Sequence, residues 1–228
     1  MIQDAHNAYN SGDFATALKY YSDLADAGDA TAQTSLGFMY QNGQGTPVDE
    51  AKALEYYTKA AGHKEPYALF NLALLYAHGT GGLPHDQFKA HELFLEAAVR
   101  EVPAAQYETG LMLERGLGCV QNFSEAAFWY EEAAKRGHTE AFNNLGVLYK
   151  EGHGVMQDHQ RAYICFSRAA EAGLPTAMYN LGLLYDQGLG VEEDHDKALD
   201  WCRKAAYNGH EKAKGIIKGL QEEGKIVF

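Results

Sequence analysis

A short pattern of residues recurs along this chain at a nearly constant spacing of 36 residues. Each copy has an alanine that begins a helical pattern, followed by a glycine, a tyrosine and a pair of alanines. The marker alanines are Ala32, Ala68, Ala105, Ala141, Ala177 and Ala213, at steps of 36, 37, 36, 36 and 36 residues. A period in this range is typical of stacked repeat arrays. Because one repeat cannot bury its apolar face alone, we expect an elongated array of packed neighbours.

Residues 139–174 show the repeating unit most clearly. Their first part has apolar or small residues at helical spacing, which predicts a first helix. Gly152 and Gly154 then suit a tight turn that needs a positive φ. Asp158 is placed to cap a second helix, and Gly173 ends it. The sequence therefore predicts a helical hairpin whose recurring aromatic residues fill the space between helices.

The first-helix pattern A-x-x-x-L-G-x-x-Y-x-x-G-x-G occurs as ATAQTSLGFMYQNGQG at residues 30–45 and as TEAFNNLGVLYKEGHG at 139–154. A capped second helix that ends in two alanines follows each copy. This unit resembles the Sel1-like repeat, a relative of the tetratricopeptide repeat. The resemblance implies an all-α fold, a right-handed α-solenoid of stacked antiparallel helical hairpins.

The expected organisation has three parts. Residues 1–29 resemble a tetratricopeptide hairpin that caps the array, and residues 211–228 form a C-terminal capping helix and tail. Between them lie five Sel1-like repeats, at residues 30–66, 67–103, 104–138, 139–174 and 175–210.

Three departures from the pattern predict local irregularity. The loop from Gly79 to Asp86 is one residue longer than the other loops. Lys64 and Glu101 stand where other units have a closing glycine. The third repeat has Thr109 and Leu113 in place of the usual Leu and Tyr.

Acidic residues outnumber basic ones, 31 to 19, which gives a formal net charge of −12. Such a surface repels phosphate backbones and anionic bilayers, so nucleic acid and membrane surfaces are poor partners. No apolar run approaches the roughly 18 residues that a membrane span requires, and we expect a soluble protein. The three cysteines share no periodic position, which disfavours a disulfide ladder and favours the cytoplasm. An exported or periplasmic location stays open if a leader was removed before the first residue.

The sequence offers no recognisable catalytic, cofactor-binding or metal-binding site. The ten histidines show no pair with ligand spacing within one helix. The Gly-x-Gly strings join helix to helix at the repeat period, which makes them structural. Residues 219–225 resemble a phosphate-binding loop only by chance, because no strand precedes them and Ile226 stands where Ser or Thr would bind magnesium.

The resemblance also implies where a ligand would bind, because the first helices of tetratricopeptide-type arrays line their concave face. The candidate contacts are Phe38, Phe70, Leu74, Tyr107, Leu111, Glu114, Asn143, Lys150, Tyr179 and Asp186. Their largely apolar and aromatic character suits an extended peptide or an amphipathic helix.

We therefore expect a non-enzymatic scaffold or adaptor that binds a peptide or protein segment and is a monomer or weakly self-associating. Two alternatives stay open. One is an array that assembles with itself through its unfinished C-terminal unit. The other is a hydrolase acting on cell-wall or β-lactam-like substrates, an activity claimed for disulfide-rich relatives.

Overall fold

The computed structural model of this protein describes residues 1–223, and within that range it contains helices and no strand. The expected tail at residues 224–228, together with the end of the phosphate-loop lookalike, lies outside the described residues. The described part falls into two compact units, residues 1–121 and residues from 122 onward, and each is treated by itself.

The first unit contains seven helices. They are α1 (Ile2–Asn10), α2 (Phe14–Asp26), α3 (Ala30–Asn42), α4 (Glu50–Gly62), α5 (Pro66–His78), α6 (Gln87–Val99) and α7 (Pro103–Arg115). The second unit contains six. They are α8 (Phe123–Lys135), α9 (Thr139–Glu151), α10 (His159–Glu171), α11 (Pro175–Gln187), α12 (His195–Tyr207) and α13 (Glu211–Glu222).

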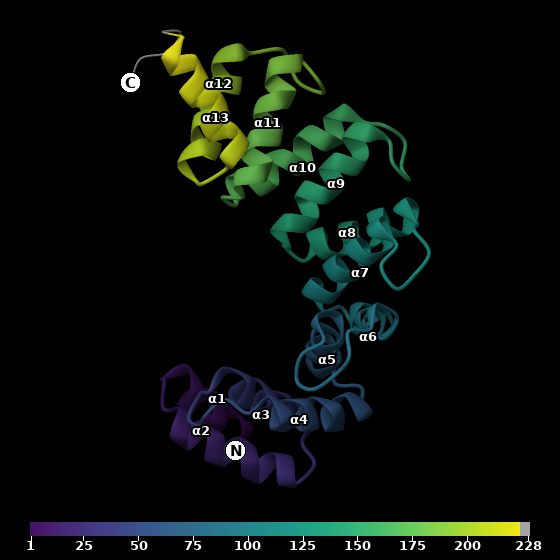
Figure 1. The fold of residues 1–228 in the computed structure, drawn as a ribbon, viewed down its shortest axis with the longest axis vertical. Coiled ribbons are helices and arrows are strands. Elements are labelled where there is room, and N and C mark those ends of the chain that lie inside the picture. Colours follow the sequence, from purple (N-terminus) through teal and green to yellow (C-terminus); the bar gives the residue numbers. More distant parts are fainter. Residues whose placement is uncertain (224–228) are drawn as a thin grey trace. The chain divides into compact units, whose positions relative to one another are not determined.

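Within each unit, every helix packs against the next one along the chain (Figure 1). The expected all-α architecture of stacked antiparallel hairpins is thus confirmed. No helix among residues 1–223 combines the length and the apolar character needed to cross a membrane.

Local signals set the ends of the helices. Each second helix begins after a polar residue whose side chain accepts a hydrogen bond from a backbone amide in the first turn. These caps are Asp13, Asp49, Asp86, Asn122, Asp158 and Asp194. The first helices α3, α5, α7, α9 and α11 each end at a glycine with φ between 62° and 74°, a conformation that favours glycine.

The extra residue after Gly79 alters only the loop. The amide of Asp86 donates to the carbonyl of Tyr76 at 2.9 Å, as the amide of Asp49 does to Tyr40. Helices α5 and α6 each keep the 13 residues of the other full repeats. The expected irregularity is therefore confined to the loop itself.

Lys64 and Glu101 adopt the same left-handed turn as the glycines that they replace, with φ of 61° and 64°. The left-handed turn is thus retained at these two junctions. The substitution is absorbed as backbone strain, because residues with a Cβ rarely adopt this region.

In the α3–α4 and α9–α10 hairpins, a ring of the second helix packs on a glycine of the first helix. A Cβ added at Gly37 would lie 2.6 Å from Cε1 of Tyr57, and one added at Gly146 would lie 2.7 Å from Cε1 of Phe166. Both rings are fully buried. Glycine is required at these positions because the ring occupies the space that any side chain would need.

Candidate functional site

The candidate contacts of the first unit lie on α3, α5 and α7, with unequal exposure. Phe38 is 42% exposed. The other members are half-buried, and they are Phe70, Leu74, Tyr107, Leu111 and Glu114. Phe38 therefore offers more of its side chain to a partner than any of these five.

Two of these residues, Phe38 and Phe70, come together in a hollow of about 410 Å³, called here the α3–α5 hollow. Its aromatic lining also includes Tyr67 of α5 and, from the N-terminal hairpin, Tyr9 and Tyr21. The contribution of α1 and α2 was missed by the sequence argument, which considered only the five full repeats. The repeated aromatic residues of the segment AYNSGDFATALKYY were the available signal.

Glu65 supplies a carboxylate to this aromatic hollow. Its Oε2 accepts a hydrogen bond from the hydroxyl of Thr34 at 2.7 Å and from the amide of Ala68 at 2.6 Å. These two bonds fix the carboxylate at the start of α5. A hollow with five phenyl or phenol rings, the imidazole of His6 and one carboxylate suits an apolar segment that carries a basic side chain.

Tyr179 and Asp186 come together in a second hollow, of about 690 Å³, called here the α11–α13 hollow. Leu199 and Cys202 of α12 and Ile216 of α13 also line it. These residues were not predicted, because second helices were assigned to packing alone and α13 was expected to act only as a cap. The signal that was available is Cys202, a small residue 36 positions after the buried ring of Phe166.

Two residues that line the α11–α13 hollow already contact histidines of the chain itself. Oδ1 of Asp186 lies 3.0 Å from Nδ1 of His195. The ring of Tyr179 stacks on His210 with their centroids 4.5 Å apart. Burial lowers the pKa of His210 and raises the pKa of the Cys202 thiol, so both side chains favour their neutral forms.

Asn143, another of the candidate contacts, is buried. Its side chain is only 7% exposed, and its Oδ1 accepts a hydrogen bond from Nδ2 of Asn180 at 2.9 Å. The bond links α9 to α11, the first helix of the next repeat. Asn143 therefore holds neighbouring repeats together, a role that depends on a partner 37 residues away.

The remaining candidates line neither of the two hollows. Lys150 is half-buried, and its Nζ lies 4.0 Å from Oε1 of Glu151. Leu74, Tyr107, Leu111 and Glu114 are half-buried on the first helices of their own repeats.

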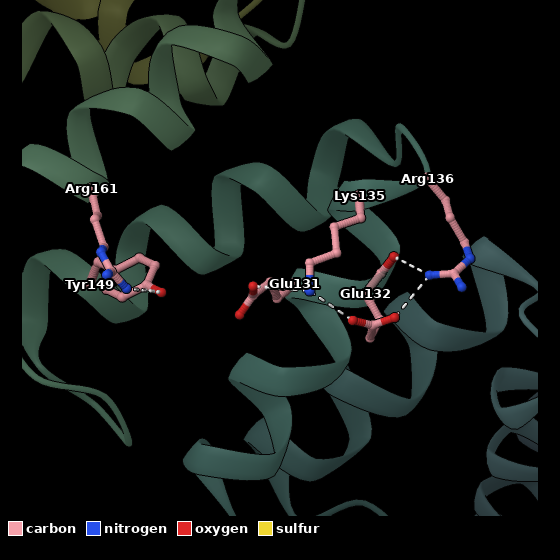
Figure 2. Close-up of polar contacts among 6 residues, drawn as sticks. All are labelled: Glu131, Glu132, Lys135, Arg136, Tyr149 and Arg161. Atoms are coloured by element: carbon pink, nitrogen blue, oxygen red, sulfur yellow. Dashed lines mark hydrogen bonds and ion pairs between the residues drawn. The ribbon is translucent and has the colours of Figure 1, made fainter.

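Charged side chains gather on α8, where they pair along the helix (Figure 2). Lys135 lies 3.1 Å from Glu131 and 2.9 Å from Glu132, and Arg136 lies 3.0 Å from Glu132. The hydrogen bonds from Lys135 and Arg136 lower the pKa of Glu132. Such pairs at spacings of three and four residues contribute to helix stability.

Arg161 of α10 makes a different contact, with Tyr149 of α9 (Figure 2). Its Nη1 donates to the tyrosine hydroxyl at 3.2 Å, and its guanidinium carbon lies 5.4 Å from the ring centroid. This contact ties the two helices of one hairpin together. Among residues 1–223, no group of three or more His, Cys, Asp or Glu side chains is placed to hold a metal ion.

Comparison with known proteins gives consistent similarities. A Schizosaccharomyces pombe protein, chitin synthase regulatory factor 4, is 36% identical over 131 residues, 57% of this chain. The match spans 20% of that relative's length. A Sel1 repeat protein from Oxalobacter formigenes superimposes with a TM-score of 0.90 at 29% identity, over 97% of this chain and 88% of its own.

A protective antigen present in uropathogenic Escherichia coli strains is also similar. It superimposes with a TM-score of 0.84 at 28% identity, over 92% of this chain and 45% of its own. The sequence model of the Sel1 repeat matches five segments, at residues 30–63, 66–98, 103–138, 139–174 and 175–210. These segments cover most of the chain, which therefore belongs to the Sel1 repeat family.

Proposed function

We propose that this protein is a non-enzymatic interaction module that binds a polypeptide segment on the surface of its first helices. The observation that carries the proposal is the α3–α5 hollow, where Phe38 and Phe70 of successive repeats lie beside an N-terminal hairpin that adds further rings. Aromatic residues in concave sites dominate the energetics of protein recognition. The relative named as a regulatory factor supports a role exerted through other proteins.

Charge supports a partner with basic residues. The chain carries a formal net charge of −12, and the carboxylate of Glu65 lies in the hollow itself. A net negative surface attracts a basic segment and accelerates its association. We therefore infer that the bound segment combines apolar side chains with at least one Lys or Arg.

The proposal is tested by selecting 12-residue peptides from a displayed random library on the purified protein. Recovered peptides are expected to be rich in apolar residues and in Lys or Arg. Their affinities are then measured for Phe38→Ala, for Glu65→Gln and for the control Phe88→Ala. Phe88 is 64% exposed on the second helix α6 of the same unit and does not line the hollow.

Phe38→Ala is expected to weaken binding by about tenfold or more, the effect of removing an anchoring ring. Glu65→Gln is expected to weaken binding of the basic peptides several-fold and to reduce its dependence on salt. Phe88→Ala is expected to change affinity less than twofold. Equal effects of Phe38→Ala and Phe88→Ala, with folding intact, would place the binding surface elsewhere.

A further inference from the structure

One recurring ring is missing from the last full repeat. The second helices supply Tyr57, Phe94, Tyr130 and Phe166, and each of these rings is at most 2% exposed. The next position of the series, 36 residues after Phe166, holds Cys202. The thiol is much smaller than a phenyl or phenol ring, so the repeat lacks the group that fills this space elsewhere.

The glycine that accommodates the ring is nevertheless present. Gly182 occupies the position of Gly37 and Gly146, whose Cβ would collide with Tyr57 and Phe166. At Gly182, the nearest atoms to an added Cβ are the carbonyl oxygen of Ala198 at 3.1 Å and Cβ of Trp201 at 3.5 Å. No ring atom is among the three nearest atoms there.

The space next to Gly182 belongs to the α11–α13 hollow. Gly182 and Cys202 both line this hollow of about 690 Å³, together with Leu183, Leu199 and Ile216. Cys202 itself is 9% exposed, so the thiol lies at the inner wall. Replacement of a ring by a thiol has thus left an apolar recess that is continuous with the surface.

We propose that this hollow binds the side chain of a Phe or Tyr presented by a partner polypeptide. The incoming ring packs between Gly182 and Cys202, as the chain's own rings pack in the other hairpins. The inference deepens the proposed function, on which it rests, because the hollow opens beside Tyr179, Leu183 and Asp186 of a first helix. It assigns the second unit an aromatic anchor point of its own.

Two features favour a polypeptide over a free aromatic compound. The carboxylate of Asp186, a side chain that is 55% exposed, lies at the hollow and can accept a hydrogen bond from a backbone amide that flanks the ring. The hollow also exceeds the volume of a single ring, so it has room for the main chain that carries the ring.

The first experiment uses small probes on the full chain. N-acetylphenylalanine amide is titrated and followed by the backbone amide signals of Gly182, Ala198 and Cys202 in NMR spectra. It is expected to shift these signals and to bind at least tenfold more tightly than N-acetylalanine amide, because only the former has a ring to bury. Absence of shifts in these three signals at the highest soluble concentration of N-acetylphenylalanine amide would overturn the proposal.

The second experiment restores the missing ring. Cys202→Phe is expected to fold, to be more stable to heat and to lose the response to N-acetylphenylalanine amide, because its own ring fills the recess. Cys202→Ser is the matched control, since it keeps the size of the side chain, and it is expected to bind the probe as the natural chain does. Cys202→Leu fills the recess in part and is expected to bind with intermediate affinity.

Several outcomes would contradict the proposal. If the Cys202→Phe variant binds N-acetylphenylalanine amide with unchanged affinity, the probe binds outside the recess. Binding of toluene without binding of N-acetylphenylalanine amide would assign the hollow to free aromatic compounds. Self-association that Cys202→Phe abolishes, measured by light scattering, would assign it to a second copy. Tighter binding after deletion of residues 224–228 would assign it to the chain's own last residues.

The experiments can refute the proposed peptide-binding surface and the aromatic recess independently of each other. A chain that binds no peptide through Phe38 but responds to N-acetylphenylalanine amide would refute the proposed surface of the first unit alone. A chain that binds peptides through Phe38 but gives the same response in Cys202→Phe and Cys202→Ser would refute the aromatic recess alone.

Discussion

At the scale of single residues, a glycine and a ring act as one packing unit, as Gly37 with Tyr57 and Gly146 with Phe166 show. Sequence spacing predicts recurring small residues on the first helices and aromatic residues that fill the space between helices, because both follow the repeat period. What spacing does not predict is whether the partner is present, as Cys202 shows opposite Gly182. Nor does it predict that Asn143 is buried, since that depends on the hydrogen bond from Asn180.

This pairing predicts unequal effects of Gly→Ala substitutions. Gly37→Ala and Gly146→Ala are each expected to lower the free energy of unfolding by about 1 to 3 kcal/mol, because the new methyl group collides with a buried ring. Gly182→Ala is expected to change it by less than about 1 kcal/mol, since the better helix propensity of alanine offsets a tight contact with Ala198.

Urea denaturation of the three variants measures these differences. All three sites are helical, so the gain in helix propensity is common to them and the comparison isolates the ring contact. A loss in Gly182→Ala as large as that in Gly146→Ala would show that the ring does not set the requirement for glycine.

At the scale of elements, the junction between repeats depends on one left-handed residue after each second helix. Gly137, Gly173 and Gly209 adopt φ of 87°, 94° and 97°, while Lys64 and Glu101 adopt 61° and 64° in the corresponding place. The sequence identifies these positions, but it does not show whether a missing glycine changes the turn or strains it. The hydrogen bond from Glu65 N to Ala60 O matches that from Leu174 N to Ala169 O, which shows that the turn is kept.

The strain at these junctions is measurable. Gly173→Ala is expected to lower the free energy of unfolding by about 1 kcal/mol, because nothing lies within 4 Å of the added Cβ and only the backbone conformation is penalised. Lys64→Gly is expected to raise the free energy of unfolding by up to about 1 kcal/mol, because glycine adopts the left-handed turn without strain. Loss of the exposed ion pair between Lys64 and Glu96 reduces this gain by a small amount.

Thermal and urea unfolding of both variants provide the check. Lys64→Ala removes the ion pair but retains the Cβ, so it serves as the reference for Lys64→Gly. If Lys64→Gly were no more stable than Lys64→Ala, the left-handed turn would carry no strain.

At the scale of the whole molecule, stability is distributed along the chain. Each helix within a unit packs mainly against its neighbours in sequence, so stability is approximately a sum of repeat terms and terms between adjacent repeats. The helix order was predictable because each repeat carries its own caps and turns. The two hollows were not, because they combine first helices with α1, α2, α12 and α13.

This distribution predicts that a local defect stays local. Ile217 of α13 is 7% exposed in the core of the second unit. Ile217→Ala is expected to accelerate backbone amide hydrogen exchange in α12 and α13 by tenfold or more, while α1 to α4 keep their rates. Exchange measured by mass spectrometry on proteolytic fragments distinguishes this from a uniform acceleration, which would indicate one globally cooperative core.

The loop between Gly79 and Asp86 shows how such a chain tolerates changes in length. It accommodates an added residue while the bond from Asp86 to Tyr76 closes it as in shorter loops. The inserted residue is accommodated within the loop, so α6 begins at the usual place relative to α5 and has the usual length. Gly82 in this loop, where nothing lies within 4 Å of an added Cβ, is therefore a suitable place to graft an epitope or a fluorescent label without disturbing the stacking of the helices.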